Sequence, residues 1–533
     1  MRLHRLTRAC ILAGTAATAL SISATAVAAS APALADDTAN TPANSAVDSA
    51  VTAVDSAVKN VVLEVGATDS EVHLTWMSDL GHQDEQAIIA KASDVADKQF
   101  PEYAQRVDAA GELTGSASRV YDATVTGLEP GTEYTYAVGS DAYGWSAPET
   151  FTTNETSGDW NFLFFGDPQV GASHDLDADT KGWKKALETA TAAHPDTDFL
   201  LSAGDQVNDV SQAQHDAFKS PAQLRQFPLA VNDGNHDNRD FHMYRQNYSW
   251  PNVSDEVKER DYYFERGNAL IVSLDSNLSS SADIDSHKEY LRQVIGSKGA
   301  DKDWVVVTYH HSPFSQAYHQ NDGDVKRLRE GLTPVMSELG VDAVLGGHDH
   351  IYTRSYLMEG TKPVVPEEKP AAGDVLHPQD GQVLYMIASS ASGSKFYDFW
   401  ADGKTYKDLS EEEAAEKGLT APFTARWNQD RTPDYTNVEV TANTLTLTTY
   451  NVDDGSIVDK VTLAKDGADA GDSGAGNGDG ADNGTGADNS TGDGGHQPGG
   501  DQPGGNQPDG KLSGGLSSTS SSLSSNLLFG SFR

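Results

Sequence analysis

The chain has 533 residues and a formal net charge of −41, with 79 acidic side chains against 38 lysines and arginines. This charge would repel a polyanion, so we expect no nucleic acid partner. The single cysteine, Cys10, lies near the N-terminus, which excludes disulfides and thiolate metal sites from the rest of the chain.

The N-terminus has the pattern of a secretory signal peptide. Arginines precede an apolar run over residues 9–29, and small residues at 33–35 suit signal peptidase. We therefore expect a signal peptide over 1–35, a linker over 36–57, and a secreted or cell-envelope protein. An N-terminal membrane anchor is the weaker alternative. No later stretch reaches the roughly 18 apolar residues of a membrane helix, so we expect no transmembrane segment in the mature chain.

Residues 58–153 have the pattern of a small β-sandwich. Short runs of β-forming residues are separated by turns, one of them at Gly127–Thr132. The runs lie at 61–65, 72–76, 119–125 and 134–138. The segment Leu-Glu-Pro-Gly-Thr-Glu-Tyr at 128–134 resembles fibronectin type III modules.

Residues 158–465 are typical of a layered α/β domain, because apolar strand-like runs alternate with amphipathic stretches. The strand-like runs lie at 162–165, 199–201, 270–274, 304–307, 343–345, 383–387, 437–440, 444–450 and 457–463. Helical periodicity occurs around 183–190, 287–295 and 325–339. The segment 360–377 contains proline and charge, which predicts a surface excursion.

The C-terminal segment 466–533 is rich in Gly, Asp and Ser and holds nine aspartates against Lys511 and Arg533. It has too little apolar surface to offset the entropy of ordering, so we expect a disordered tail. Association with the cell envelope through this tail is left open.

Five polar clusters, each at the end of an apolar run, carry the chemistry. They are Gly166–Gln169, Gly204–Asn208, Gly234–Asp237, His310–Pro313 and Gly347–His350. One such cluster is weak evidence, since turns favour Gly, Asp and Asn. The ordered series is specific, because the carboxyl ends of strands in an α/β sheet gather ligand sites at one edge. Carboxylates, an amide and imidazoles suit Zn, Fe or Mn, and two such ions about 3.5–4 Å apart can clamp a phosphoryl group.

On these motifs the chain resembles the calcineurin-like metallophosphoesterases, and the β-rich segment before them makes it similar to the purple acid phosphatases. The resemblance covers about residues 58–465. It implies a multidomain chain in which a fibronectin III-like β-sandwich precedes an αββα metallophosphoesterase domain. It also implies a phosphoric ester hydrolase with two divalent or trivalent transition-metal ions, Fe, Zn or Mn.

The resemblance also assigns roles to the residues of the five clusters. The first metal ion would be held by Asp167, Asp205 and His350, with Asp205 bridging. The second would be held by Asn235, His310 and His348. His236 would be catalytic, contacting the phosphate and protonating the leaving oxygen, while a metal-bound hydroxide attacks phosphorus in line.

Neighbouring residues receive secondary assignments. The pattern Val307-x-x-His310, followed by Phe314, favours His310 over His311 as the ligand. His311 and His319 then become candidates for substrate binding, and an exposed loop position is the alternative for His319. Asp237 or Asp209 would orient His236, and the sequence does not choose between them. The segment 239–245 could line the substrate pocket, but an ordinary surface helix or loop is the favoured alternative. Ser389–Ser394 is not counted as functional.

Two positions depart from the family. Asn208 stands where purple acid phosphatases have the tyrosine that gives their colour, and Gln169 stands where many relatives have histidine. Either amide is a candidate additional metal ligand. We therefore expect a protein that is not purple.

The sequence thus predicts a secreted, acid-phosphatase-like phosphomonoesterase acting on a phosphorylated small molecule. A phosphodiesterase or nucleotidase using the same site is the first alternative. A non-catalytic surface binding protein is the second, and the complete ligand set argues against it.

Overall fold

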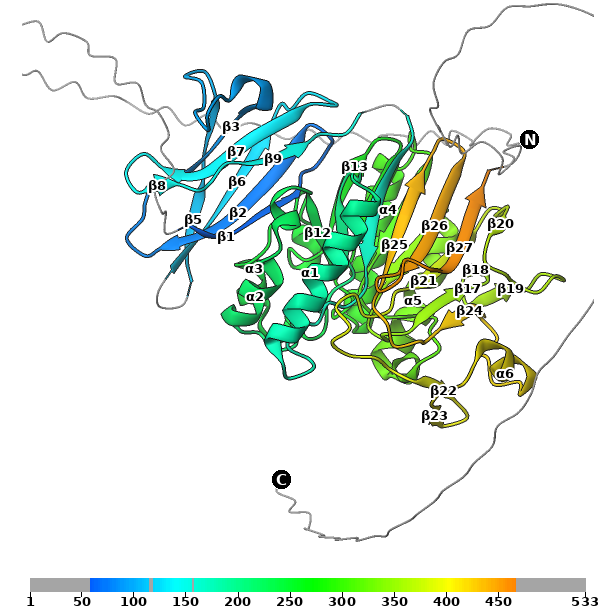
Figure 1. Cartoon of the computed structure of the whole chain (residues 1–533). Coiled ribbons are helices and arrows are strands. Elements are labelled where there is room, and N and C mark those ends of the chain that lie inside the picture. The colour runs from blue at the N-terminus through cyan, green and yellow to red at the C-terminus, as the bar shows by residue number, and fades with distance from the viewer. Residues whose placement is uncertain (1–57, 115–117, 156–157, 466–533) are drawn as a thin grey trace, which may run out of the picture. The chain divides into compact units, whose positions relative to one another are not determined.

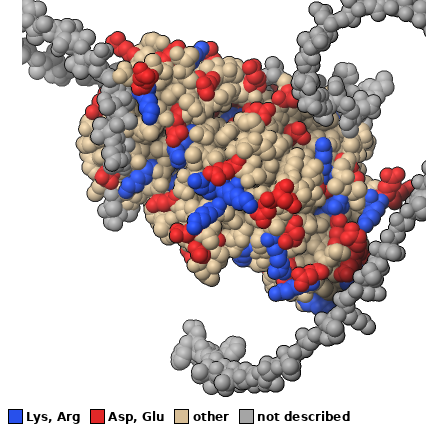
Figure 2. Space-filling view, viewed as in Figure 1, with Lys and Arg blue, Asp and Glu red and all other residues tan. Residues whose placement is uncertain are grey.

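The computed structural model describes residues 58–114, 118–155 and 158–465. The predicted signal peptide, linker and disordered tail lie outside these ranges. No helix within the described ranges is long and apolar enough to cross a membrane. Acidic and basic side chains occur side by side over the face seen in Figure 2.

The N-terminal domain is a β-sandwich, as predicted (Figure 1). One sheet has the order β1-β2-β6-β5, and the other has the order β4-β3-β7-β8 with β9 on β7. Val72, Leu74 and Trp76 alternate along β2 and enter the core between the sheets. The elements are β1 Lys59–Val65, β2 Glu71–Asp79, β3 Gln86–Lys91, η1 Ala92–Asp94, β4 Gln105–Asp108, β5 Ala110–Thr114, β6 Ser118–Thr126, β7 Glu133–Ser140, β8 Gly144–Trp145 and β9 Glu149–Thr152.

The second domain contains two further groups of paired strands. The first group has the order β20-β27-β26-β25-β10-β11-β12, in which β10, β11 and β12 are parallel. Its strands are β10 Trp160–Phe165, β11 Leu200–Ser202, β12 Leu229–Val231, β20 Asp374–Leu376, β25 Asp434–Val440, β26 Thr444–Asn451 and β27 Ile457–Ala464.

The second group has the order β13-β14-β15-β16-β21-β17-β24, with β18 and β19 at its side. Its strands are β13 Tyr262–Arg266, β14 Ala269–Ser273, β15 Trp304–Thr308, β16 Ala343–Gly346, β17 Tyr352–Ser355, β18 Leu357–Glu359, β19 Lys362–Val364, β21 Gln382–Ile387 and β24 Thr424–Asn428. A separate hairpin joins β22 Phe399–Ala401 to β23 Lys404–Tyr406.

Helices cover the outer faces of both sheets. Trp183 of α1 packs edge-on against Phe165 of β10, with the ring centroids 5.3 Å apart. Leu291 of α4 and Leu332 of α5 share a core with Val305 of β15. The helices are α1 Leu176–Ala193, α2 Gln212–Lys219, α3 Phe241–Arg245, α4 Ser281–Lys298, α5 Gly323–Leu339 and α6 Glu411–Glu416, with 3-10 turns η2 Ala222–Arg225, η3 Asp237–Asp240, η4 Asp255–Val257 and η5 Tyr318–Asn321.

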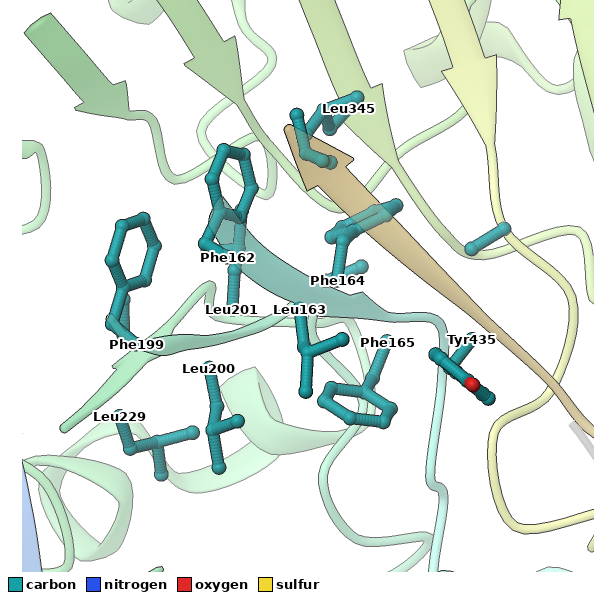
Figure 3. Packing of buried hydrophobic residues seen from close by; sticks show 14 of the residues in the cluster. Phe162, Leu163, Phe164, Phe165, Phe199, Leu200, Leu201, Leu229, Leu345 and Tyr435 are labelled. Carbon is teal, nitrogen blue, oxygen red and sulfur yellow. The ribbon is translucent and has the colours of Figure 1, made fainter. Parts of the chain in front are cut away.

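Strand β10 shows why its sequence is continuously apolar. All six of its residues are buried, since one face meets the other sheet and the opposite face meets helix α1. Figure 3 shows Phe162 and Phe164 on the side of Leu345, and Leu163 and Phe165 on the side of Leu200. The αββα layering that the family resemblance implied is therefore confirmed.

One sheet runs through both domains, which the sequence pattern did not indicate. Strand β1 of the sandwich pairs in parallel with β12 through Glu64 and Leu229, and this makes an 11-stranded sheet. The hydroxyl of Tyr136 also donates to the carbonyl of Arg225 at 2.8 Å, and Arg225 pairs with Glu149 at 2.9 Å.

The predicted excursion over 360–377 carries two short strands. Strand β19 pairs with β18, and β20 adds in parallel to the edge of β27. These strands were missed because three-residue strands are too short to show a period.

Candidate metal centre and active site

The five polar clusters follow β10, β11, β12, β15 and β16. The structure brings them together at the carboxyl ends of these parallel strands. Donor atoms of Asp167, Asp205 and His310 all lie within 4.8 Å of one another, and all three residues are buried. This placement agrees with the expectation from the sequence that the five motifs converge.

Glycines allow the clusters to approach so closely. A Cβ on Gly347 would lie 2.0 Å from Oδ1 of Asp167, and one on Gly234 would lie 2.2 Å from Oδ1 of Asp205. Gly204 has a φ of +102°, and its Cβ would lie 2.6 Å from Nδ1 of His310. Any side chain at these positions would therefore displace a candidate ligand.

Several candidate ligands occupy the left-handed backbone region. The φ angles are 47° at Asp205, 73° at His348, 44° at His350 and 34° at Gln169. Such conformations cost about 1–3 kcal/mol each and cluster at functional sites. The N–H of His348 donates to Oδ1 of Asp167 at 2.9 Å, which helps hold this turn.

The Nε2 atom of His310 offers a lone pair toward the lone pairs of neighbouring oxygen and nitrogen atoms. Its Nδ1 lies 3.0 Å from the carbonyl of Ala203, so that nitrogen carries the proton and donates it. Its Nε2 lies 3.1 Å from Oδ1 of Asn235, 3.5 Å from Oδ1 of Asp205 and 3.2 Å from Nδ1 of His348. Electron-pair donors that converge at these distances suit a cation between them.

His350 has the same pattern as His310, with one ring nitrogen at a main-chain carbonyl and the other facing a carboxylate. Its Nδ1 lies 2.9 Å from the carbonyl of Lys395, and its Nε2 faces Oδ2 of Asp167 at 3.1 Å. The two clusters of converging nitrogen and oxygen donors fit a pair of transition-metal ions. The residues present therefore suit the metals that the family resemblance implied.

The electrostatics favour the ligand forms of these side chains. Burial raises the pKa of Asp167, but its interactions with His350, His310 and the N–H of His348 outweigh burial and lower it to about 2. Burial and the neighbouring histidines hold the pKa of His348 well below 6.5, which keeps its imidazole neutral. Burial lowers the pKa of His311 to about 3.

The two positions that depart from the family lie side by side. Nε2 of Gln169 donates to Oδ1 of Asn208 at 3.2 Å. Oε1 of Gln169 is buried and has no hydrogen-bond partner among the described residues. An orphaned amide oxygen beside this cluster is a donor of the type that a metal ion could use.

The imidazole of His236 is held by a main-chain carbonyl, and its backbone N–H donates to Oδ1 of Asp205 at 2.8 Å. Its Nδ1 lies 2.6 Å from the carbonyl of Asn208, and its Nε2 lies 3.9 Å from Oδ2 of Asp205. Asp237 instead accepts N–H groups of the surrounding loops, and Asp209 pairs with Arg239 at 3.1 Å. The prediction that Asp237 or Asp209 orients His236 is therefore wrong, because the group that contacts its ring nitrogen is the Asn208 carbonyl.

The two remaining candidates, His311 and His319, have their rings next to that of His348. The ring of His311 is 4.6 Å from that of His348, and its Nδ1 contacts Oγ of Ser276 at 2.8 Å. The ring of His319 is 4.4 Å from that of His348, and its Nδ1 contacts Asp322 at 2.7 Å. His319 is half-buried in the 3-10 turn η5, and its role in substrate binding stays a prediction.

The serine-rich loop after β21, Ser389–Ser394, was not counted as functional from the sequence, yet it contacts the first polar cluster. Oγ of Ser390 donates to the carbonyl of Asp167, and Oγ of Ser394 donates to that of Pro168, both at 3.2 Å. Arg239 of η3 also donates to the carbonyl of Asn208 at 3.0 Å and is exposed, as expected for a surface segment. The signal for the loop was present, because it follows a strand of the same sheet.

Comparison with known proteins identifies both domains. Residues 58–153 match the N-terminal domain of purple acid phosphatases, and residues 161–352 match the calcineurin-like phosphoesterases. The chain is a purple acid phosphatase-like member of the calcineurin-like phosphoesterases. The phosphoesterase match begins in β10 and ends in β17, so it includes all five clusters.

Individual relatives support this assignment. Purple acid phosphatase 15 of Arabidopsis thaliana is 24% identical over 135 residues, which cover 24% of this chain and 25% of that protein. An uncharacterised protein of Mycobacterium tuberculosis is 26% identical over 282 residues, covering 45% and 52%. The chain thus spans between a quarter and about half of these relatives.

A solved structure agrees at the level of the fold. Purple acid phosphatase PPD1 from yellow lupin seeds superposes with a TM-score of 0.59 and 14% identity, covering 77% of this chain and 75% of that one. At this identity the likeness shows the fold alone.

Proposed function

We propose that this metallophosphoesterase is a dinuclear enzyme that hydrolyses phosphomonoesters. The observation that supports this most is the set of opposed lone pairs on His310, His350 and their oxygen neighbours. Two bound ions would activate water and polarise the phosphoryl group. We assign one ion to Asp167, Asp205 and His350, and the other to Asp205, Asn235, His310 and His348.

The protein's own groups position the substrate around these ions. The Asn208 carbonyl fixes the proton of His236 on Nδ1, so Nε2 faces the Asp205 carboxylate and the space where a phosphoryl group would lie. The rings of His311 and His319 both lie next to the ring of His348, a candidate metal ligand, which supports a role for them in binding the substrate.

The decisive experiment pairs metal analysis of native protein with a screen of phosphate mono- and diesters. Wild type should contain about two transition-metal ions and prefer monoesters. His236→Ala should lower kcat by about a hundredfold or more while it keeps the metals, since this residue contacts substrate. His377→Ala, at an exposed position, serves as the matched control. Loss of metal in His236→Ala would show that the role is misassigned.

The same metal-loaded sample tests the departure at Asn208. Without a tyrosine at this position, we expect no strong visible absorption band, and the metals need not include ferric iron. An intense tyrosinate–iron band in native protein would contradict the proposed ligand set.

We also propose that the protein is exported and that its mature chain begins after residue 35. The support is the charged start, apolar run and small residues of the N-terminus. Terminal sequencing of protein recovered from the culture medium should find Asp36 at the start. Retention of residues 1–35 in that fraction would count against export by cleavage.

A further inference from the structure

A lysine of the serine-rich loop lies beside the metal centre. The carbonyl of Lys395 accepts the hydrogen bond from Nδ1 of His350 at 2.9 Å, so the backbone of this residue is tied to a candidate ligand. Its Nζ lies 4.7 Å from the centre of the Tyr397 ring. That ring in turn lies 5.1 Å from the rings of both His350 and His319. The ammonium of Lys395 thus lies against a tyrosine ring that itself contacts two histidines of the candidate site.

The charge of this lysine is not neutralised by the protein. Lys395 is half-buried, yet it forms no ion pair in the parts of the chain that the structure describes. Arg239, beside His236, differs because Asp209 already pairs with it.

A partly buried ammonium without a carboxylate partner is costly unless a ligand supplies the opposite charge. The candidate ligands around it are assigned to metal ions, so the remaining anion is that of the substrate. A phosphate monoester carries two negative charges near neutral pH and a diester carries one. A fixed cation therefore favours the monoester by charge alone.

We propose that Lys395 binds the phosphoryl group directly and makes the site selective for phosphate monoester dianions over diesters. The inference rests on the proposed function, and it adds a substrate-binding residue from a loop that the five motifs do not include.

The test replaces Lys395 with methionine, which keeps the apolar stem against Tyr397 and removes the charge. Lys404→Met is the matched control, because Lys404 lies 4.9 Å from the ring of Tyr406 with the same sequence spacing but is exposed on the hairpin. Metal content, the Kd of inorganic phosphate by calorimetry, and kcat/KM for p-nitrophenyl phosphate and bis(p-nitrophenyl) phosphate are measured for both variants.

Lys395→Met should bind phosphate about tenfold or more weakly and lose a similar factor with the monoester, as expected for a charge-assisted hydrogen bond. The diester rate and the metal content should change little, and Lys404→Met should match wild type. Lys395→Arg should recover part of the phosphate affinity, because it keeps the charge. Lys395→Gln, which also removes the charge, replaces the methionine variant if that variant does not fold.

Wild-type phosphate affinity in Lys395→Met would overturn the inference. Equal losses with both substrates, accompanied by loss of metal, would also overturn it by showing a structural role. If wild type hydrolyses neither ester, the proposed function fails, while the calorimetric comparison still decides whether Lys395 binds phosphate.

Discussion

At the scale of residues, the site depends on glycines, which have no side chain to fill the space beside the candidate ligands. Gly347 and Gly234 leave the space that the oxygens of Asp167 and Asp205 occupy. The left-handed backbone at His348 and His350 then turns both imidazoles toward the cluster. Because interiors are close-packed, one added methyl group at such a glycine has to move a ligand.

Gly347→Ala should therefore lower metal content and activity together. The new Cβ would meet Oδ1 of Asp167 at 2.0 Å, and a well-packed site has no room to absorb it. Metal analysis and kcat/KM of the same preparation provide the measurement. The control is Gly296→Ala within α4, where a Cβ meets nothing within 4 Å and helix propensity should even stabilise by up to about 1 kcal/mol. Full metal content in Gly347→Ala would refute this account of the glycine.

At the scale of elements, a buried ion pair joins the two sheets of the phosphoesterase domain. Nε of Arg354, on β17, donates to Oδ2 of Asp459, on β27, at 2.7 Å, and both side chains are 1% exposed. The hydroxyl of Tyr352 donates to the same oxygen at 2.8 Å. The pair joins the two sheets whose ends carry the proposed metal site.

Arg354→Met should destabilise the protein by about 3 kcal/mol or more, because it leaves the carboxylate of Asp459 buried without its closest cation. The free energy of unfolding in urea measures the loss. Lys185→Met is the control, since Lys185 and Asp453 form a pair in which both side chains are about half exposed. That substitution should cost at most about 1 kcal/mol. Equal effects of the two substitutions would contradict the structural role of the buried pair.

At the scale of the whole molecule, a buried glutamate lies where the two domains meet. Glu64 of β1 accepts the N–H of Ser249 at 2.8 Å and the hydroxyl of Thr75. Burial raises its pKa from 4.5 to about 8. Since its strand also pairs with β12, the protonation of this carboxyl is linked to the joint between sandwich and phosphoesterase domain.

Stability should consequently fall as the pH rises from about 5 to 8. In this range the unfolded chain has lost the Glu64 proton and the folded protein retains it, so folding becomes progressively less favourable. Glu64→Gln mimics the protonated form and should flatten the dependence of Tm on pH, whereas Glu102→Gln at the exposed surface should not. Parallel profiles for wild type and Glu64→Gln would show that this carboxyl ionises normally in the fold.

The order of the domains, the layered fold and the convergence of the five motifs could be predicted from the amino-acid sequence. Those features are local: apolar runs mark buried strands such as β10, and glycine-flanked polar residues mark their ends. The sequence also identified Gln169 and Asn208 as departures from the family, because residue identity is enough for that comparison.

Contacts between a side chain and a distant part of the backbone, and ion pairs buried between the sheets, became visible only in the tertiary structure. A main-chain carbonyl has no side-chain signature, so only the fold could show that Asn208 holds His236 and that Lys395 holds His350. The pairing of β1 with β12 and the ion pair of Arg354 with Asp459 join residues 165 and 105 positions apart. Such contacts follow from how the sheets pack, whereas periodicity along the chain reports only which face of each element is buried.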